Sequence, residues 1–120
     1  MGLVIADTNI VIYILKGIAS VESYLNYDFA LSDITVIELL GVKDIEKQTL
    51  KIRQEFINSA YIYPLNYNIR QLAISLKQKY TLKIPDAIIA ATALDYSQPL
   101  LTADKDFKRI IELPAIINSL

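Results

Sequence analysis

Short apolar runs along this chain alternate with longer segments in which apolar residues recur at helical spacing. The short runs are rich in β-branched residues, which is typical of buried parallel strands. The predicted strands are 2–6, 29–31, 61–65, 99–102 and 115–117, and the predicted helices are 8–16, 20–25, 34–40, 44–58, 66 or 68 to 80, 87–94 and 104–111. This alternation predicts an α/β fold, a three-layer sandwich around a mainly parallel sheet of about five strands.

Short polar residues mark the beginnings of the predicted helices, where a side-chain oxygen can accept a hydrogen bond from a free backbone N–H. Thr8 or Asn9 is predicted to cap the first helix, and Ser20 the short helix that follows it. Ser32 or Asp33 offers a cap for the apolar helix that ends near residue 41. The predicted helices 8–16 and 34–40 therefore each begin directly after a predicted strand.

Composition narrows the chemistry that is open to this protein. The 120 residues are 53% hydrophobic, which predicts one globular domain over 1–120. Cysteine and histidine are both absent, which excludes disulfides, zinc fingers, thiol nucleophiles and histidine-based triads. The apolar N-terminus lacks a basic region and is interrupted by Asp7 and Asn9, so we expect a cytoplasmic protein with no membrane segment. Catalysis must therefore use carboxylates, hydroxyls, lysines or a metal-bound water.

Four acidic residues occupy positions that suit a site. Asp7 and Asp104 each follow a predicted strand, Asp86 opens the most apolar helix, and Glu38 interrupts the apolar run 34–40. Each also has an ordinary interpretation, because Asp7 and Asp104 could only cap helices and Asp86 could only favour a helix N-terminus. However, the carboxyl ends of parallel strands share one edge of a sheet, so these acids are expected to converge there. The short segments that carry these four acids contain no Lys or Arg to pair with them, so their mutual repulsion calls for Mg²⁺ or Mn²⁺.

The segments around these acids resemble those of a known family. Residues 6–9 (ADTN), 35–40 (TVIELL), 85–93 (PDAIIAATA) and 101–107 (LTADKDF) resemble the four signature segments of the PIN-domain ribonucleases. In length and motif spacing the chain is similar to the VapC toxins of VapBC toxin–antitoxin pairs. The resemblance spans nearly the whole chain and implies a PIN-like three-layer α/β/α fold.

The resemblance assigns roles to individual residues. The family's acidic quartet falls on Asp7, Glu38, Asp86 and Asp104. Asp7 and Asp86 are the first expected metal ligands, with Asp104 next and Glu38 acting through water. Asn9 and Thr102 match auxiliary polar positions, and Asp106 matches a variable extra acid. Many relatives carry Asn at the position of Asp104, so a direct ligand and a water-orienting group both stay open there.

The leading hypothesis is a Mg²⁺-dependent endoribonuclease toxin, restrained by a VapB-like antitoxin and acting on RNA. One alternative is a PIN-type nuclease for RNA processing or for DNA, without an antitoxin. Another is a receiver-like α/β interaction domain, although the third predicted strand ends without the acid that such a domain needs.

Charge and hydropathy suggest how partners would bind. Once the quartet is set aside, nine acidic residues remain against 12 basic ones, so the remaining surface leans positive. The candidates for contact with an RNA backbone are Lys43, Lys47, Lys51, Arg53, Lys77, Lys79 and Lys83. The mean hydropathy of +0.35 also predicts a homodimer, because it exceeds what a core of this size requires.

Overall fold

The computed structural model describes residues 2–117 and contains one five-stranded sheet in which every adjacent pair is parallel. The strands are β1 (Leu3–Ala6), β2 (Asp28–Ser32), β3 (Tyr61–Tyr63), β4 (Leu100–Thr102) and β5 (Ala115–Ile117). Their order across the sheet is β3-β2-β1-β4-β5. The predicted α/β class and strand count are confirmed, and the sheet is wholly rather than mainly parallel.

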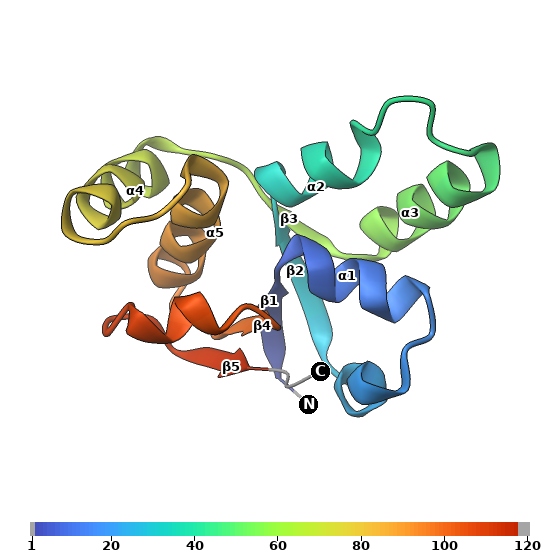
Figure 1. Cartoon of the computed structure of the whole chain (residues 1–120), viewed down its shortest axis with the longest axis horizontal. Helices are drawn as coiled ribbons and strands as arrows, with labels where there is room; N and C mark the ends of the chain where they lie inside the picture. The colour runs from blue at the N-terminus through green and yellow to red at the C-terminus, as the bar shows by residue number, and fades with distance from the viewer. Residues whose placement is uncertain (1, 118–120) are drawn as a thin grey trace.

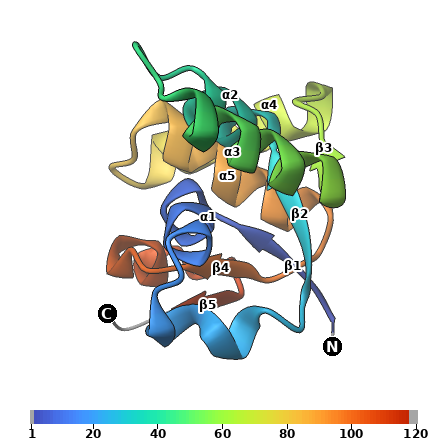
Figure 2. The same ribbon diagram turned by 90° about the vertical axis from the view of Figure 1, so that its right-hand side faces the viewer.

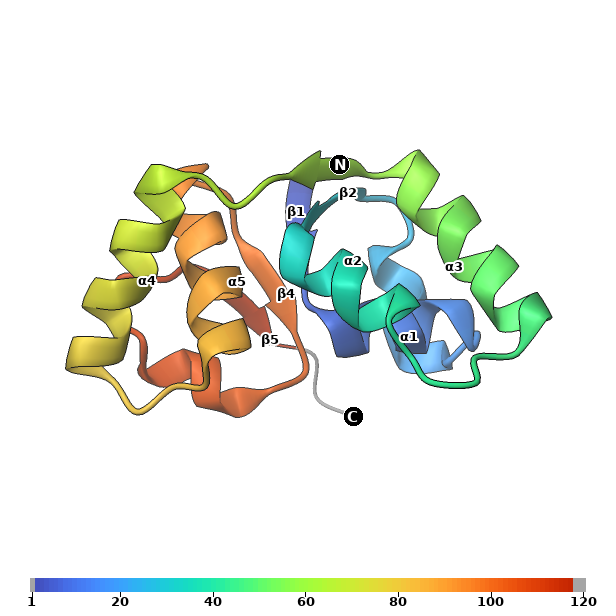
Figure 3. The ribbon, with the colours of Figure 1, turned by 90° about the horizontal axis from the view of Figure 1, so that it is seen from above.

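Helices cover both faces of this sheet, which makes three layers (Figure 1). The helices are α1 (Thr8–Leu15), α2 (Asp33–Leu40), α3 (Lys47–Ser59), α4 (Tyr67–Lys79) and α5 (Ile84–Asp95), with the 3₁₀ helices η1 (Ala19–Tyr24) and η2 (Lys105–Arg109). In Figure 1 the pair α4 and α5 lies to the left of the sheet, and α1 and α3 lie to the right. Figure 2 shows α1 alongside β1, and Figure 3 shows α2 between α5 and α3.

The core is divided by the sheet because successive strand residues point to opposite faces. Ile5 and Leu100 pack with α4 and α5, whereas Val4 and Leu101 pack with α1 and the buried Leu39 of α2. All five side chains are almost completely buried. In the part of the chain that the structure describes, no helix is both long and apolar enough to cross a membrane.

The strand order creates a crevice beside β1. The chain moves from β1 outward to β2 and β3, and then crosses to the other side of β1 to form β4 and β5. Helices that follow β1 and β4 therefore leave the sheet in different directions, and a gap opens at the carboxyl ends of these two strands. Asp7 and Asp104 stand at this switch point.

Several predicted boundaries are wrong for local reasons. The helix predicted over 44–58 begins only at Lys47, because Asp44 has a left-handed backbone with φ of 56° that a helix cannot include. The helix predicted over 104–111 is the shorter 3₁₀ helix η2, capped by Asp104. The predicted cap at Ser20 is also wrong, since η1 begins one residue earlier and Ile18 precedes it.

Candidate metal centre

Four carboxylates from separate segments line one pocket of about 120 Å³ at the switch point. We call it the acidic pocket, and its wall consists of Asp7, Thr8, Asn9, Glu38, Asp86, Ile89, Asp104 and Phe107. The acids come from the end of β1, from α2, from the first turn of α5 and from the residue before η2. The predicted convergence of the quartet is therefore present in the structure.

Asp7 is the most buried of these acids, with an exposed fraction of 6%. It is the first residue after β1, and its extended backbone makes it the N-cap of α1. Its Oδ1 accepts a hydrogen bond of 2.9 Å from the backbone N–H of Ile10. The prediction that Thr8 or Asn9 caps this helix is therefore wrong by one or two positions. Capping fixes the Asp7 carboxylate but leaves it in the pocket wall.

Thr102 connects two of the acids from the fully buried end of β4. Its hydroxyl donates to Oδ2 of Asp7 and accepts a hydrogen bond of 3.0 Å from the backbone N–H of Asp104. Asp104 then caps η2, because its Oδ1 accepts from the N–H of Asp106 at 2.9 Å. The carboxylate of Asp104 therefore caps η2 and also lines the acidic pocket, so the two interpretations of this residue are compatible.

Glu38 faces the pocket from α2 even though its neighbour Leu39 is fully buried. Residues one position apart on a helix point about 100° apart, so Glu38 lies at the surface while Leu39 packs under the helix. The Thr8 hydroxyl donates to Oε1 of Glu38 over 2.6 Å and lies 3.2 Å from the hydroxyl oxygen of the buried Thr35. Thr8 therefore orients this carboxylate from the opposite side of the pocket.

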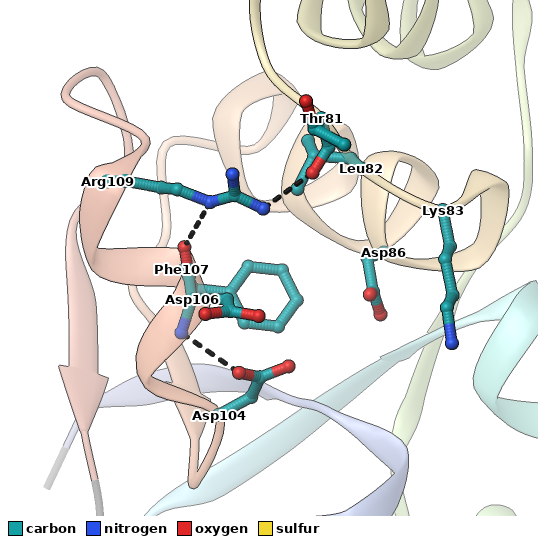
Figure 4. A pocket seen from close by; sticks show the side chains of 8 residues that line it. All are labelled: Thr81, Leu82, Lys83, Asp86, Asp104, Asp106, Phe107 and Arg109. Atoms are coloured by element: carbon teal, nitrogen blue, oxygen red, sulfur yellow. Dashed lines mark hydrogen bonds between the residues drawn. The ribbon is translucent and has the colours of Figure 1, made fainter.

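Asp86 lies in the first turn of α5, where Pro85 occupies an N-terminal helical position and Asp86 is half-buried. It lines the acidic pocket and also a second cavity of about 260 Å³ (Figure 4). We call this second space the side cavity, and its wall consists of Thr81, Leu82, Lys83, Asp86, Asp104, Asp106, Phe107 and Arg109. The two spaces share Asp86, Asp104 and Phe107, so they adjoin.

The acidic pocket has four carboxylates and no basic residue in its described wall. Burial raises the pKa of the Asp7 carboxyl above its ordinary value, and the charges of Asp104 and Asp86 raise it further, while hydrogen bonds from Thr102 and Ile10 act in the opposite direction. Burial, followed by the charges of Asp104 and Glu38, also raises the pKa of Asp86, although nearby Lys83 lowers it. Within residues 2–117 the one ion pair joins Lys79 to Glu112, and neither residue lines the acidic pocket.

The donor set suits a hard divalent cation. The pocket offers carboxylate and hydroxyl oxygen atoms, which Mg²⁺ and Mn²⁺ prefer, and repulsion between the carboxylates adds to the effect of burial in raising the pKa values of Asp7 and Asp86. Among the residues that the structure describes, no three acidic side chains are already placed to hold an ion together.

A family model described as PIN domain matches residues 4–113 of this chain. The chain belongs to the PIN-domain family. This confirms the family predicted from the four sequence segments, and the arrangement of the sheet and helices is the PIN-like fold that the resemblance implies. Membership favours a nuclease over the receiver-like alternative.

The relatives of this PIN-domain chain include two curated proteins. Ribonuclease VapC of Rickettsia bellii is 35% identical, with 97% of this chain and 96% of the relative covered. Ribonuclease VapC1 of Rickettsia felis is 36% identical, with coverage of 99% and 98%. The match extends along nearly the full length of all three proteins, so it includes every segment that carries a quartet residue.

Solved structures support the same relationship. A toxin–antitoxin complex from Klebsiella pneumoniae contains a chain with a TM-score of 0.82 and 29% identity, and the match covers 96% of this chain and 97% of that one. VapBC2 of Rickettsia felis, bound to a DNA fragment from its promoter, has a TM-score of 0.80 and 27% identity, with coverage of 98% for both chains.

The auxiliary residues predicted for this PIN-domain chain occupy three different places. Asn9 lines the acidic pocket, Thr102 lies behind Asp7, and Asp106 lines the side cavity but not the acidic pocket. The sequence predicts Thr8 only as a helix cap and does not point to Arg109. Thr8 could have been found from its place at the same strand end as Asp7, whereas nothing in the sequence indicates the position of Arg109.

Proposed function

We propose that this chain is the toxin of a VapBC-type toxin–antitoxin pair, an endoribonuclease that cleaves RNA phosphodiester bonds with the help of Mg²⁺ or Mn²⁺. The observation that carries this proposal is the convergence of Asp7, Glu38, Asp86 and Asp104 on one pocket in a PIN-domain chain. Its curated relatives are ribonucleases, and chains of similar structure occur in toxin–antitoxin complexes.

Asp7, Asp86 and Asp104 would hold the cation, and Glu38 would contact it through water. When bound, a divalent ion would lower the pKa of a water and stabilise negative charge on the phosphate and on the leaving oxygen. Asp7 suits direct ligation because two hydrogen bonds already fix its carboxylate, so little side-chain freedom is lost when a ligand binds. Asp104 is linked to Asp7 through Thr102, which sets the distance between their segments.

Glu38 would orient the attacking water. Its Oε1 is occupied by the Thr8 hydroxyl, and its exposed position leaves Oε2 able to accept a hydrogen bond from water. A carboxylate held in one orientation in this way can act as a proton acceptor at a defined place. Thr8 is thus a positioning residue for Glu38.

We also propose that this chain acts in the cytoplasm, as a homodimer that a VapB-like antitoxin inhibits. An inhibitory segment that places an Arg or Lys in the acidic pocket would supply the positive charge that the acids lack. Exposed large hydrophobic residues, among them Ile37, Ile84 and Tyr67, are consistent with a buried interface. Sedimentation of the isolated chain tests the dimer, and a clean monomer at high micromolar concentration would contradict it.

The decisive experiment is cleavage of total RNA by the purified chain, with Mg²⁺ and with excess chelator. Asp86→Asn should abolish cleavage, because it removes one charge and one ligand from the pocket. Asp95→Asn is the matched control, since Asp95 is also half-buried but ends the same helix away from the pocket. Near-parent cleavage by Asp86→Asn would show that the acidic pocket is not the active site.

The alternative without an antitoxin is tested separately. Expression of the chain should arrest growth, and co-expression of the small protein encoded by the neighbouring gene should restore it. Cleavage in vitro without rescue by that protein would favour a PIN-type nuclease for RNA processing. Faster cleavage of a DNA substrate than of RNA would favour a DNA nuclease.

A further inference from the structure

The side cavity extends the acidic pocket in one direction. The two spaces share Asp86, Asp104 and Phe107, so a chain-like substrate bound at the acids would continue into the side cavity (Figure 4). Its wall contains two basic residues, Lys83 and Arg109, whereas the acidic pocket contains none among the residues that the structure describes. These two cations are candidates for contact with a polyanion that leaves the acidic pocket.

The guanidinium of Arg109 already donates two hydrogen bonds within the protein. Its Nε donates to the backbone oxygen of Asp106 over 3.2 Å, and one terminal N–H donates to the backbone oxygen of Thr81 over 2.5 Å. Figure 4 shows the guanidinium reaching from η2 to the segment before α5. Arg109 therefore joins the two walls of the side cavity.

A second cation fixes the same segment from the other side. Lys77 of α4 donates from Nζ to the backbone oxygen of Leu82 over 2.7 Å. The carbonyls of residues 81 and 82 are thus each held by a charged donor, and Leu82 itself is buried. Charge-assisted hydrogen bonds of this kind are stronger than neutral ones, so the backbone that leads into Lys83 has a fixed position.

The ammonium group of Lys83 has no direct hydrogen-bond partner in the described chain, although its charge lowers the pKa of nearby Asp86. It is the exposed N-cap residue of α5, and within the described chain it makes no side-chain hydrogen bond and no ion pair. Figure 4 shows its side chain running beside that of Asp86. Two other basic residues that the sequence suggests for RNA contact already have partners. Lys77 donates a hydrogen bond to the backbone oxygen of Leu82, and Lys79 donates one to the carboxylate of Glu112.

An RNA strand needs such a cation at this place. Phosphodiesters flank the bond that is cleaved, and the carboxylates of Asp86, Asp104 and Asp106 repel each of them. A bound divalent ion offsets that repulsion at the cleaved phosphate, while a neighbouring phosphate requires its own positive charge. Lys83 supplies that charge from a backbone that is fixed before the substrate arrives, which reduces the entropy lost on binding.

We propose that Lys83 is a substrate-positioning residue, and that its ammonium binds the phosphodiester next to the cleaved one as the RNA passes through the side cavity. This inference rests on the proposed ribonuclease function. Of the several basic residues that are candidates for RNA contact in the sequence, it assigns this contact to Lys83, and it gives the direction in which the substrate leaves the acidic pocket.

The test measures binding and cleavage in four proteins: the parent, Lys83→Met, Lys83→Arg and Lys108→Met. Lys108 is the matched control, because it is exposed on η2 and is not part of the side-cavity wall. Binding of a fluorescent, mixed-sequence, single-stranded RNA 12-mer is measured in chelator over a range of salt concentrations. Loss of one phosphate contact should make the plot of log Kobs against log salt less steep by about 0.7.

We expect this change for Lys83→Met, and a parent-like slope for Lys83→Arg and Lys108→Met. In Mg²⁺, Lys83→Met should raise KM for the RNA while kcat stays near the parent value, because the contact is made in both the ground state and the transition state. Equal slopes for Lys83→Met and the parent, or equal losses for Lys83→Met and Lys108→Met, would overturn the assignment.

The outcomes separate this inference from the proposed function. A parent that cleaves RNA while Lys83→Met keeps the parent slope contradicts only the role of Lys83. A parent that binds RNA with the expected dependence on Lys83, but does not cleave it with Mg²⁺ or Mn²⁺, contradicts only the function. A parent that neither binds nor cleaves RNA contradicts both.

Discussion

The hydroxyl of Thr102 joins the carboxylate of Asp7 to the backbone amide of Asp104, across the two strands that border the switch point. Thr102→Val keeps the side-chain shape and removes this connection. Because both groups lose a partner in a buried place, we expect a loss of about 1–3 kcal/mol in the free energy of unfolding. RNA cleavage should fall much further, since Asp7 and Asp104 are no longer held together.

Thr102→Ser is the control for that substitution, because it keeps the hydroxyl and loses only a methyl group. Its free energy of unfolding should fall by about 1 kcal/mol, and its cleavage rate should stay near that of the parent. Urea unfolding and RNA cleavage are the two measurements. If Thr102→Val cleaves RNA as well as Thr102→Ser does, the hydroxyl has no part in forming the site.

Asp7→Asn should abolish cleavage and leave the metal-free protein at least as stable as the parent at neutral pH. The folded state raises the pKa of Asp7, so between about pH 4 and that raised value the folded chain binds more protons than the unfolded chain. The stability of the parent therefore falls as pH rises through this window. Asn has no charge to desolvate and can still cap α1, so the stability difference in its favour should grow over the same window.

Thermal melts in chelator between pH 4 and 8 measure this difference, with Asp28→Asn at an exposed strand end as the control. In millimolar Mg²⁺ the Tm of the parent should rise clearly and that of Asp7→Asn much less, because an ion stabilises only the state that binds it. A variant that melts well below the parent in chelator at pH 7 would identify Asp7 as a structural cap.

Glu38→Gln should reduce RNA cleavage strongly with little effect on folding. The side chain is exposed, and the amide oxygen can still accept the hydrogen bond from Thr8, so we expect less than about 1 kcal/mol of change in stability. Glu55→Gln on the exposed side of α3 is the matched control and should leave cleavage unchanged. A loss of several kcal/mol for Glu38→Gln would instead indicate a structural acid.

Arg109→Met should loosen the segment that carries Lys83, because it removes the donors to the backbone oxygens of Thr81 and Asp106. The bonds are exposed, so we expect a loss of no more than about 1 kcal/mol in stability. Limited proteolysis should detect faster cutting near residues 80–83, and KM for RNA should rise. Lys105→Met, an exposed substitution on the same 3₁₀ helix, is the control, and equal proteolysis of the two variants would contradict the role of Arg109.

The sequence predicted the fold well because each strand is a short apolar run bounded by a cap or a turn residue. It predicted the convergence of the acids because parallel topology brings strand ends such as Asp7 and Asp104 together, whatever the loops do. Two hydrogen bonds could not be predicted, because both depend on how helices from distant segments pack. They are the bond from the Thr8 hydroxyl to Glu38 and the bond from Arg109 to the backbone oxygen of Thr81. The late start of α3 depends on the backbone of Asp44, for which the sequence offers no signal.

The strand order also determines when the acidic pocket can form during synthesis of the chain. Asp7 receives the hydroxyl of Thr102 across 95 positions of sequence, and β1 pairs with β4 along one side. A nascent chain that has not yet reached residue 100 therefore leaves that edge of β1 unpaired and lacks Asp104. Pairing between such distant segments is a late and comparatively slow step of folding. Such a nascent chain cannot complete the acidic pocket, so on the proposed function it should not cut RNA until β4 and Asp104 have folded onto β1.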